Sequence, residues 1–176
     1  MAKSSTSADG GGVDRRKTFE LRVRSPEGLL FVGPIVALRL PGADGHLGVL
    51  ANHAPMIAAL SCGVMHIVHP DEQRESMAIG EGFAQVAGNV AKLTIHFMDH
   101  SLEIDQDRAH RAMGRALTRL RKEVDDQGWD VERAEAALCR ALARLSACGC
   151  GCNMCSTATS VASTPVSRSI PGGTKR

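Results

Sequence analysis

The hexapeptide IDQDRA, residues 104–109, separates two halves of the chain that follow different periods. Before it, apolar and polar residues alternate in short runs such as FELRVR, residues 19–24, and this alternation is typical of half-buried β-strands. After it, apolar residues recur at helical spacing. The hexapeptide therefore marks the place where a β domain gives way to helices.

The first half is divided into short runs by clusters of Pro, Gly, Asn and Asp, which favour turns. One cluster is PGADG, residues 41–45, and another is Gly33-Pro34, which we expect to separate two strands. Many short strands with such turns between them predict a β-sandwich or flattened barrel. The expected strands cover residues 18–24, 29–32, 35–40, 47–50, 56–60, 64–68, 75–79, 83–86 and 92–97.

The second half predicts two amphipathic helices joined as an antiparallel hairpin. Asp105 suits the N-cap of the first helix, because its carboxylate can accept hydrogen bonds from amide groups one turn on. Residues 126–128, Asp-Gln-Gly, end this helix, and Asp130 caps the second. Alanine supplies much of both apolar stripes, so the helices bury little apolar area and are held only modestly. The stripes consist of Ala109, Ala112, Met113, Ala116, Leu117, Leu120 and Val124 on the first helix and of Val131, Ala134, Leu138, Ala141, Leu142 and Leu145 on the second.

These patterns predict a disordered leader at residues 1–16, a β domain at 17–100, a helical hairpin at 101–147 and a disordered tail at 148–176. The net charge of +2 provides no global field for binding nucleic acid, and no apolar run is long enough to span a membrane. The N-terminus lacks the apolar core of a secretory signal. These features favour a protein of the cytoplasm.

The six cysteines fall into two groups. Cys62 and Cys139 lie within the periodic segments, where we expect them to behave as small buried hydrophobic residues. The other four form a tight cluster in the tail, which either binds a soft metal ion or is simply part of a flexible segment. This cluster consists of Cys148, Cys150, Cys152 and Cys155.

Arginines gather on one face of each expected helix. Such a charged face is usually the solvated side of a helix. Facing arginines can instead bind a polyphosphate, because the guanidinium group matches phosphate oxygens in a bidentate manner. The two sets are Arg108, Arg111, Arg115 and Arg119 on the first helix and Arg133, Arg140 and Arg144 on the second.

No arrangement of residues in the sequence indicates catalysis. The seven histidines are scattered, and no motif pairs a nucleophile with a base. His53, which precedes Ala54-Pro55, fits a residue that stabilises a turn or contributes to an interface. We therefore interpret the chain as non-catalytic.

Four motifs occur in a fixed order over residues 18–146. They are Ser25-Pro26-Glu27, then Leu47-Gly48-Val49-Leu50 with His53-Ala54-Pro55, then Gly82-Phe83 with Val86, and finally Ile104-Asp105 with Arg108-Ala109. Together these motifs resemble the epsilon subunit of F-type ATP synthases. The resemblance implies a ten-stranded β-sandwich followed by a helical hairpin.

The resemblance also implies a function. Such a subunit is a non-catalytic part of the central stalk, and it binds the gamma subunit and the proteolipid c-ring and reaches the catalytic alpha and beta subunits. It turns with the rotor, helps to couple proton flow to ATP synthesis, and inhibits ATP hydrolysis by extending its helices into the catalytic head. Its expected place is the cytoplasmic face of the bacterial plasma membrane, as a peripheral part of the complex and without a nucleic-acid partner.

Some members of this family bind ATP between the folded helices through the motif I/L-D-x-x-R-A. Asp105 and Arg108 match that motif here. The resemblance therefore implies no required cofactor but a regulatory ATP molecule, which we expect to stabilise the closed hairpin. The similarity to the ATP-binding members extends to Arg115, Arg140 and Arg144, and to Asp99 near the expected adenosine position.

Two of the departures from the family pattern bear on the subunit interface and on the hairpin. His46 replaces an acidic residue that many relatives carry in the loop facing the proteolipid ring, and we expect His46 and His53 at the interface with that ring or with gamma. Gly114 lowers the helix propensity of the first helix by roughly 1 kcal/mol relative to Ala. Two alternative functions are a free-standing ATP-sensing module and a protein that binds metal through its Cys-rich tail.

Overall fold

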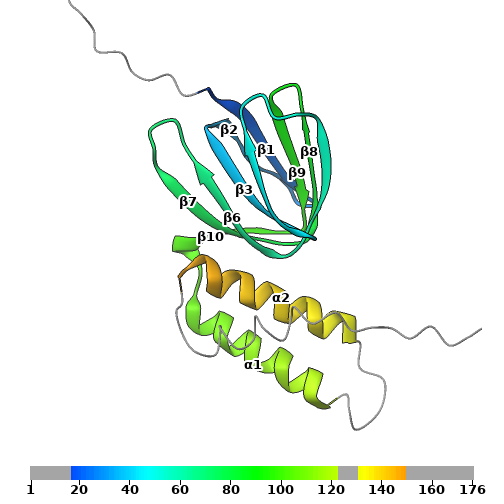
Figure 1. Cartoon of the computed structure of the whole chain (residues 1–176). Coiled ribbons are helices and arrows are strands. Elements are labelled where there is room, and N and C mark those ends of the chain that lie inside the picture. The colour runs from blue at the N-terminus through cyan, green and yellow to red at the C-terminus, as the bar shows by residue number, and fades with distance from the viewer. Residues whose placement is uncertain (1–16, 123–130, 150–176) are drawn as a thin grey trace, which may run out of the picture.

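The computed structural model describes residues 17–122 and 131–149, which form a ten-stranded sheet followed by two long helices (Figure 1). The predicted leader at 1–16, the predicted helix break at 126–128 and the predicted cap at Asp130 lie outside these residues, as does most of the predicted tail. The strands are β1 (Phe19–Ser25), β2 (Gly28–Ile35), β3 (Ala37–Gly42), β4 (Gly45–Leu50), β5 (Met56–Leu60), β6 (Gly63–Val68), β7 (Arg74–Ile79), β8 (Gly82–Ala87), β9 (Val90–Ile95) and β10 (Met98–His100). They are followed by the short 3-10 helix η1 (Ser101–Glu103), α1 (Gln106–Lys122) and α2 (Val131–Ala147).

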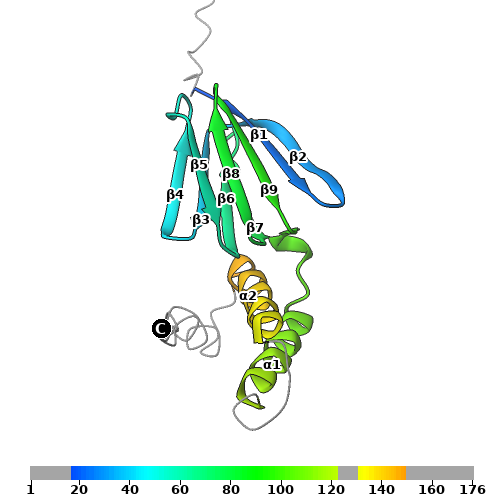
Figure 2. The same ribbon diagram turned by 90° about the vertical axis from the view of Figure 1, so that its right-hand side faces the viewer.

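The ten strands form one strongly curved sheet in the order β10-β7-β6-β3-β5-β8-β9-β1-β2, with β4 paired to β3. The other neighbouring strands pair antiparallel, but β1 and β9 pair in parallel, from Glu20 opposite Val90 to Arg24 opposite Thr94. This pairing sets the first strand between β9 and β2, as Figure 2 shows. The sheet is a nearly closed barrel, so the predicted fold class is confirmed.

The predicted break at Gly33-Pro34 is wrong, because both residues lie inside β2. Pro34 pairs with Glu20 of β1, and β2 ends the strand order, so its other edge has no strand beside it among the described residues. A proline lacks the amide hydrogen that a central strand needs, and an edge strand tolerates it for that reason. The alternation pattern also missed β10, which is only three residues long.

The core of the β domain consists of large aliphatic side chains that alternate with exposed residues along each strand. In β1, Phe19, Leu21 and Val23 are buried while Arg22 and Arg24 are exposed. The fully buried members of this core lie between Phe19 and Ile95, so the β domain fills its own interior without the helices.

The two helices pack against each other through the predicted alanine-rich stripe. Asp105 caps α1, as predicted: its Oδ1 accepts a hydrogen bond from the Arg108 amide at 2.9 Å. Val131 belongs to the predicted stripe, but it is 45% exposed because it is the first residue of α2, at the end of the interface. Val124 lies outside the described residues. The buried residues of the interface are Ala109, Met113, Ala116, Leu138, Ala141, Leu142 and Leu145.

Helix α2 lies between the β domain and α1 (Figure 1). Small side chains mediate this contact: Ala143 and Ala147 pack against Ala78 of β7. Cys62, Val64, Phe97 and Ile104 pack around them. Cys62 and Cys139 are half-buried at this boundary, so the expectation that they are buried like core residues is only partly met.

Candidate functional site

A cavity of about 550 Å³ opens where the β domain meets the helical hairpin. Its walls come from β10, from the segment around η1, and from both helices. Five of the six residues predicted to bind ATP line this cavity, although they are spread over 45 positions of the sequence. These five are Asp99, Asp105, Arg108, Arg115 and Arg144.

The start of α1 supplies one wall of the cavity. Ile104 packs into the small cluster beneath α2, which fixes the position of the helix N-terminus. The Asp105 carboxylate accepts the capping hydrogen bond of α1, and in this way it stabilises the helix N-terminus. Arg108 is one turn further on and Arg115 is two turns beyond Arg108, so both guanidinium groups project from the same side of α1.

Arg144 ties the other wall to the β domain. Its Nε donates to Asp99 Oδ2 of β10 at 2.7 Å, and its guanidinium carbon lies 4.7 Å from the centre of the Phe97 ring. Both charged side chains remain about one third exposed, so the pair can exchange with a bound anion. Arg144 therefore links α2 to the sheet at the edge of the cavity.

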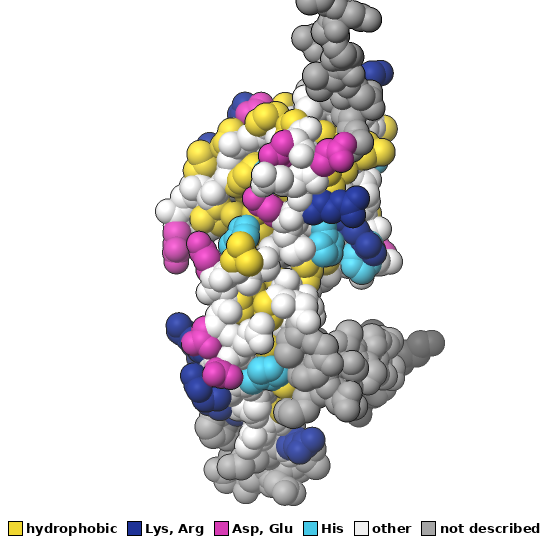
Figure 3. All heavy atoms as spheres, turned by 90° about the vertical axis from the view of Figure 1, so that its left-hand side faces the viewer, with side chains coloured by type: hydrophobic (Ala, Val, Ile, Leu, Met, Phe, Trp, Pro, Cys, Tyr) yellow, Lys and Arg dark blue, Asp and Glu magenta, His cyan; other side chains and the backbone are white. Residues whose placement is uncertain are grey.

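The charges around the cavity balance. Arg108, Arg115 and Arg144 stand against Asp99, Asp105 and Glu103. Among the ion pairs formed between described residues, none involves Arg108 or Arg115, so these two are available to an anionic ligand. Glu103 was not predicted as a site residue, and nothing in its sequence context would have singled it out. In Figure 3 basic and acidic side chains accompany each other along the helical end of the molecule.

Arg140 does not join the other five residues. It lines a smaller cavity of about 230 Å³ with Cys62, Glu81 and Phe97, between α2 and the ends of the strands. A role for Arg140 in ATP binding stays a prediction, and in this arrangement of the chain it is separate from the cavity that holds the other arginines.

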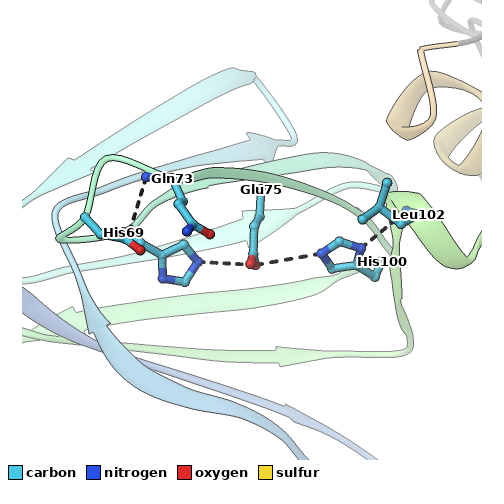
Figure 4. A network of polar contacts seen from close by, with 6 residues as sticks. His69, Gln73, Glu75, His100 and Leu102 are labelled. Carbon is cyan, nitrogen blue, oxygen red and sulfur yellow. Dashed lines mark hydrogen bonds and ion pairs between the residues drawn. The ribbon is translucent and has the colours of Figure 1, made fainter.

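A polar network that the sequence did not reveal anchors the chain just before α1 (Figure 4). Glu75 Oε2 of β7 lies 3.2 Å from His69 Nε2 and 3.9 Å from His100 Nε2. His100 Nδ1 in turn accepts a hydrogen bond from the Leu102 amide at 3.3 Å and so caps η1. The network holds the first residues of the connection to the hairpin against β7.

The two histidines predicted at a subunit interface lie away from the cavity. His46 is exposed on β4 and lines a groove of about 780 Å³ with Arg39 and His66. Burial, together with the positive charge of Arg39 and the nearby His46, lowers the pKa of His66. His53 Nδ1 lies 2.8 Å from the Ala54 carbonyl oxygen, which fits the turn-stabilising role expected of it. Contacts of either histidine with another subunit stay a prediction.

The predicted metal cluster falls mostly on residues that the structure does not describe. Cys148 is half-buried, and its thiol donates to the Leu145 carbonyl oxygen at 3.3 Å. Cys150, Cys152 and Cys155 lie outside the described residues. Within residues 17–122 and 131–149, no group of three His, Cys, Asp or Glu side chains is arranged to hold a metal ion. Neither described long helix has the length and apolar character needed to cross a bilayer.

Comparisons with known proteins agree on one family. Residues 18–96 match the β-sandwich domain of the ATP synthase delta/epsilon chain, and residues 103–149 match its long α-helix domain. The ATP synthase epsilon chain of Syntrophomonas wolfei is 39% identical over 130 residues, which cover 74% of this chain and 93% of the relative. The epsilon chain of Desulfitobacterium hafniense strain Y51 is 38% identical over 130 residues, which cover 74% of this chain and 96% of the relative.

The solved structures support the fold. A chain of the mitochondrial ATP synthase of Euglena gracilis superimposes with a TM-score of 0.64 at 22% identity, covering 83% of this chain and 89% of that one. The two matched domains coincide with the barrel and the helical hairpin, and the identities extend across both. The chain therefore belongs to the ATP synthase epsilon-chain family.

Proposed function

We propose that this chain is a non-catalytic subunit of the central stalk, which binds gamma and the c-ring through its β domain and inhibits ATP hydrolysis when its helical hairpin opens. The single observation that carries the regulatory part is the composition of the contact between α2 and the sheet. Its buried residues are Ala78, Ala143 and Ala147, which bury far less area than leucine or isoleucine. A contact of this kind separates at low cost.

We further propose that ATP binds the cavity beside this contact and keeps the hairpin closed. Arg108 and Arg115 on α1 and Arg144 on α2 can all reach a polyphosphate there, and a ligand that holds both helices favours the closed state. The three carboxylates around the cavity offset the positive charge, so the expected affinity is modest.

The bacterial relatives support a location on the cytoplasmic face of the plasma membrane, within the assembled synthase. In that setting the β domain stays with the rotor, and the hairpin moves between the closed position and the catalytic head. Coupling of proton flow to ATP synthesis then requires the β domain, whereas control of hydrolysis requires the hairpin.

Titration calorimetry of the isolated chain tests the ATP site. Arg108→Ala should weaken binding about tenfold or more, because it removes a charge-assisted hydrogen bond. Arg111→Ala is the matched control: Arg111 is exposed on the same helix but does not line the cavity, so its loss should change affinity little. Absence of any binding heat at millimolar ATP would contradict the site.

Reconstitution tests the regulatory role separately. ATP hydrolysis by the synthase is measured with the full chain and with a chain that ends at His100, which retains the whole core of the β domain. The full chain should inhibit hydrolysis at low ATP, and the shortened chain should bind the complex without inhibiting it. Equal hydrolysis with both chains at every ATP concentration would overturn the regulatory proposal.

A further inference from the structure

Two cysteines from different domains meet where α2 lies on the β domain. Cys62 is in the turn between β5 and β6, and Cys139 is near the middle of α2, 77 positions later. The Cys139 thiol donates to the Cys62 carbonyl oxygen at 3.7 Å, so the two residues are in direct contact. Both are free thiols, so the boundary between the domains holds two reduced cysteines in contact.

The surroundings fix the position of both sulfur atoms. Cys62 packs into the cluster around Ala78 and Ala143, and Ala143 is one turn beyond Cys139 on α2. The turn that carries Cys62 is itself held closely, because any side chain at Gly63 would come within 2.8 Å of the Pro41 side chain. This packing keeps the two cysteines in the contact described above while the hairpin is closed.

The pair is also accessible to small molecules. Cys62 lines the smaller cavity of about 230 Å³, together with Glu81, His96 and Arg140. Both cysteines are half-buried rather than enclosed. An oxidant as small as hydrogen peroxide can enter such a cavity and reach the sulfur atoms.

The two thiols differ in acidity. The Cys62 side chain, placed to donate to the Cys139 thiolate, lowers the pKa of Cys139, and the Arg140 guanidinium acts in the same direction, while burial and Glu81 oppose it. The pKa of Cys62 is raised, because its thiol stands beside Cys139 and is buried. Cys139 is thus the more ready nucleophile of the pair, and Cys62 is placed to react second.

We propose that Cys62 and Cys139 form a reversible disulfide that fastens α2 to the β domain and holds the hairpin closed. The Cys139 thiolate attacks hydrogen peroxide, the O–O bond breaks, and Cys139 becomes a sulfenic acid while the hydroxide released takes up a proton to form water. The Cys62 sulfur then attacks the Cys139 sulfur and displaces hydroxide, which takes the Cys62 proton and leaves as a second water. The two thiols lose two electrons and the peroxide gains two, and thiol reductants reverse the reaction.

The regulatory consequence rests on the proposed function, but formation of the disulfide does not. If the hairpin must open to inhibit hydrolysis, the disulfide removes the inhibition, and peroxide becomes a second signal beside ATP. The chemistry can therefore be tested on the isolated chain before any reconstitution.

Peptide mapping of the full chain tests the bond directly. Trypsin places Cys62 in residues 40–74, Cys139 in residues 134–140 and the four tail cysteines in residues 145–168, so each pairing gives a distinct product. After treatment with peroxide and alkylation of free thiols, the peptides 40–74 and 134–140 should be joined, and dithiothreitol should separate them. Recovery of both peptides as alkylated thiols, or joined only to 145–168, would overturn the proposal.

Substitutions identify the pair. Cys62→Ser and Cys139→Ser should each abolish the joined product, whereas Cys148→Ser should leave it unchanged, since Cys148 contacts Leu145 at the end of α2. Circular dichroism of each variant verifies that the helices are intact. A joined product that survives Cys139→Ser would contradict the assignment.

Reconstitution separates the two proposals. The reduced chain should inhibit ATP hydrolysis, and the oxidised chain should inhibit about tenfold less, because the closed state is then held covalently. If the reduced and oxidised chains inhibit equally, the proposed locking is wrong. If the disulfide forms but neither form inhibits, and the chain ending at His100 behaves alike, the regulatory function fails while the disulfide stands.

Discussion

The β domain and the helical hairpin are packed by side chains of different size. The core of the β domain contains fully buried large residues such as Leu21, Ile67 and Leu93, whereas the smaller interface between the two helices mixes alanines with a few larger side chains, and α2 contacts the sheet mainly through alanines. Because the free energy of burial scales with apolar area, the β domain is held together more strongly than the hairpin is held to it. This difference supports the proposal that the hairpin opens while the β domain stays rigid.

The largest effect is expected from a substitution that creates a cavity in the core of the β domain. Ile67→Ala should lower the free energy of unfolding by about 4 kcal/mol, since Ile67 is fully buried in the sheet. Ile57→Ala is the matched control, because Ile57 is 76% exposed on β5 and should cost little. Urea denaturation followed by circular dichroism gives both values. Equal losses would mean that the buried core does not determine stability.

A smaller effect is expected from the same kind of change in the hairpin. Leu145→Ala should weaken the contact between the helices by about 3 kcal/mol, because Leu145 is the largest fully buried aliphatic side chain of α2. Amide hydrogen exchange should rise in α1 and α2 but not in β6 or β9. Leu102→Ala serves as control, since Leu102 is 89% exposed. Faster exchange throughout the sheet would show that the two regions unfold as one.

Substituting alanine for two glycines should change stability in opposite directions in the two regions. Gly114→Ala should stabilise α1 by about 1 kcal/mol, because an added methyl group meets nothing within 4 Å there. Gly82→Ala should destabilise the sheet, because its methyl group would overlap the Thr94 carbonyl oxygen of β9. Thermal unfolding of both variants measures the two shifts. A loss of stability in Gly114→Ala would show that α1 is more constrained than the structure indicates.

The smallest effect concerns pH. Folding lowers the pKa of His66 from its ordinary value of 6.5. As the pH falls, His66 is therefore protonated in the unfolded chain before it is protonated in the folded chain. This difference favours unfolding, so stability is lost as the pH falls below that value. His66→Gln should therefore lose less stability than the parent chain between about pH 7 and pH 5. His66 is exposed, so the difference is slight. His53→Gln is the control on the same domain, and urea midpoints across this range provide the comparison.

Local patterns in the sequence predicted most strands and both helices, because alternation and helical spacing report which residues face a core. They failed where the outcome depends on distant neighbours. Pro34 belongs to a strand only because β2 lies at an edge, and edge position follows from the pairing of β1 with β9. The three residues of β10 are too few to show a period.

The candidate site likewise has a part that the sequence predicts and a part that depends on contacts between distant residues. The start of α1 could be predicted, because Asp105 and Arg108 are local to one turn and follow a motif. The pairing of Arg144 with Asp99, and of Cys139 with Cys62, joins residues 45 and 77 positions apart, and no spacing rule connects them. The separation of Arg140 from the other arginines depends on which side of α2 meets the sheet. The sequence of α2 alone does not predict that side.

The parallel pairing of β1 with β9 has a consequence for biosynthesis. The first strand to leave the ribosome needs a partner that spans residues 90–94, so the barrel cannot close until most of the domain has been translated. The exposed Leu29, Leu30 and Val32 of neighbouring β2 are then a hazard for aggregation during that delay. The helices, whose contacts are local, add on quickly once the barrel has formed.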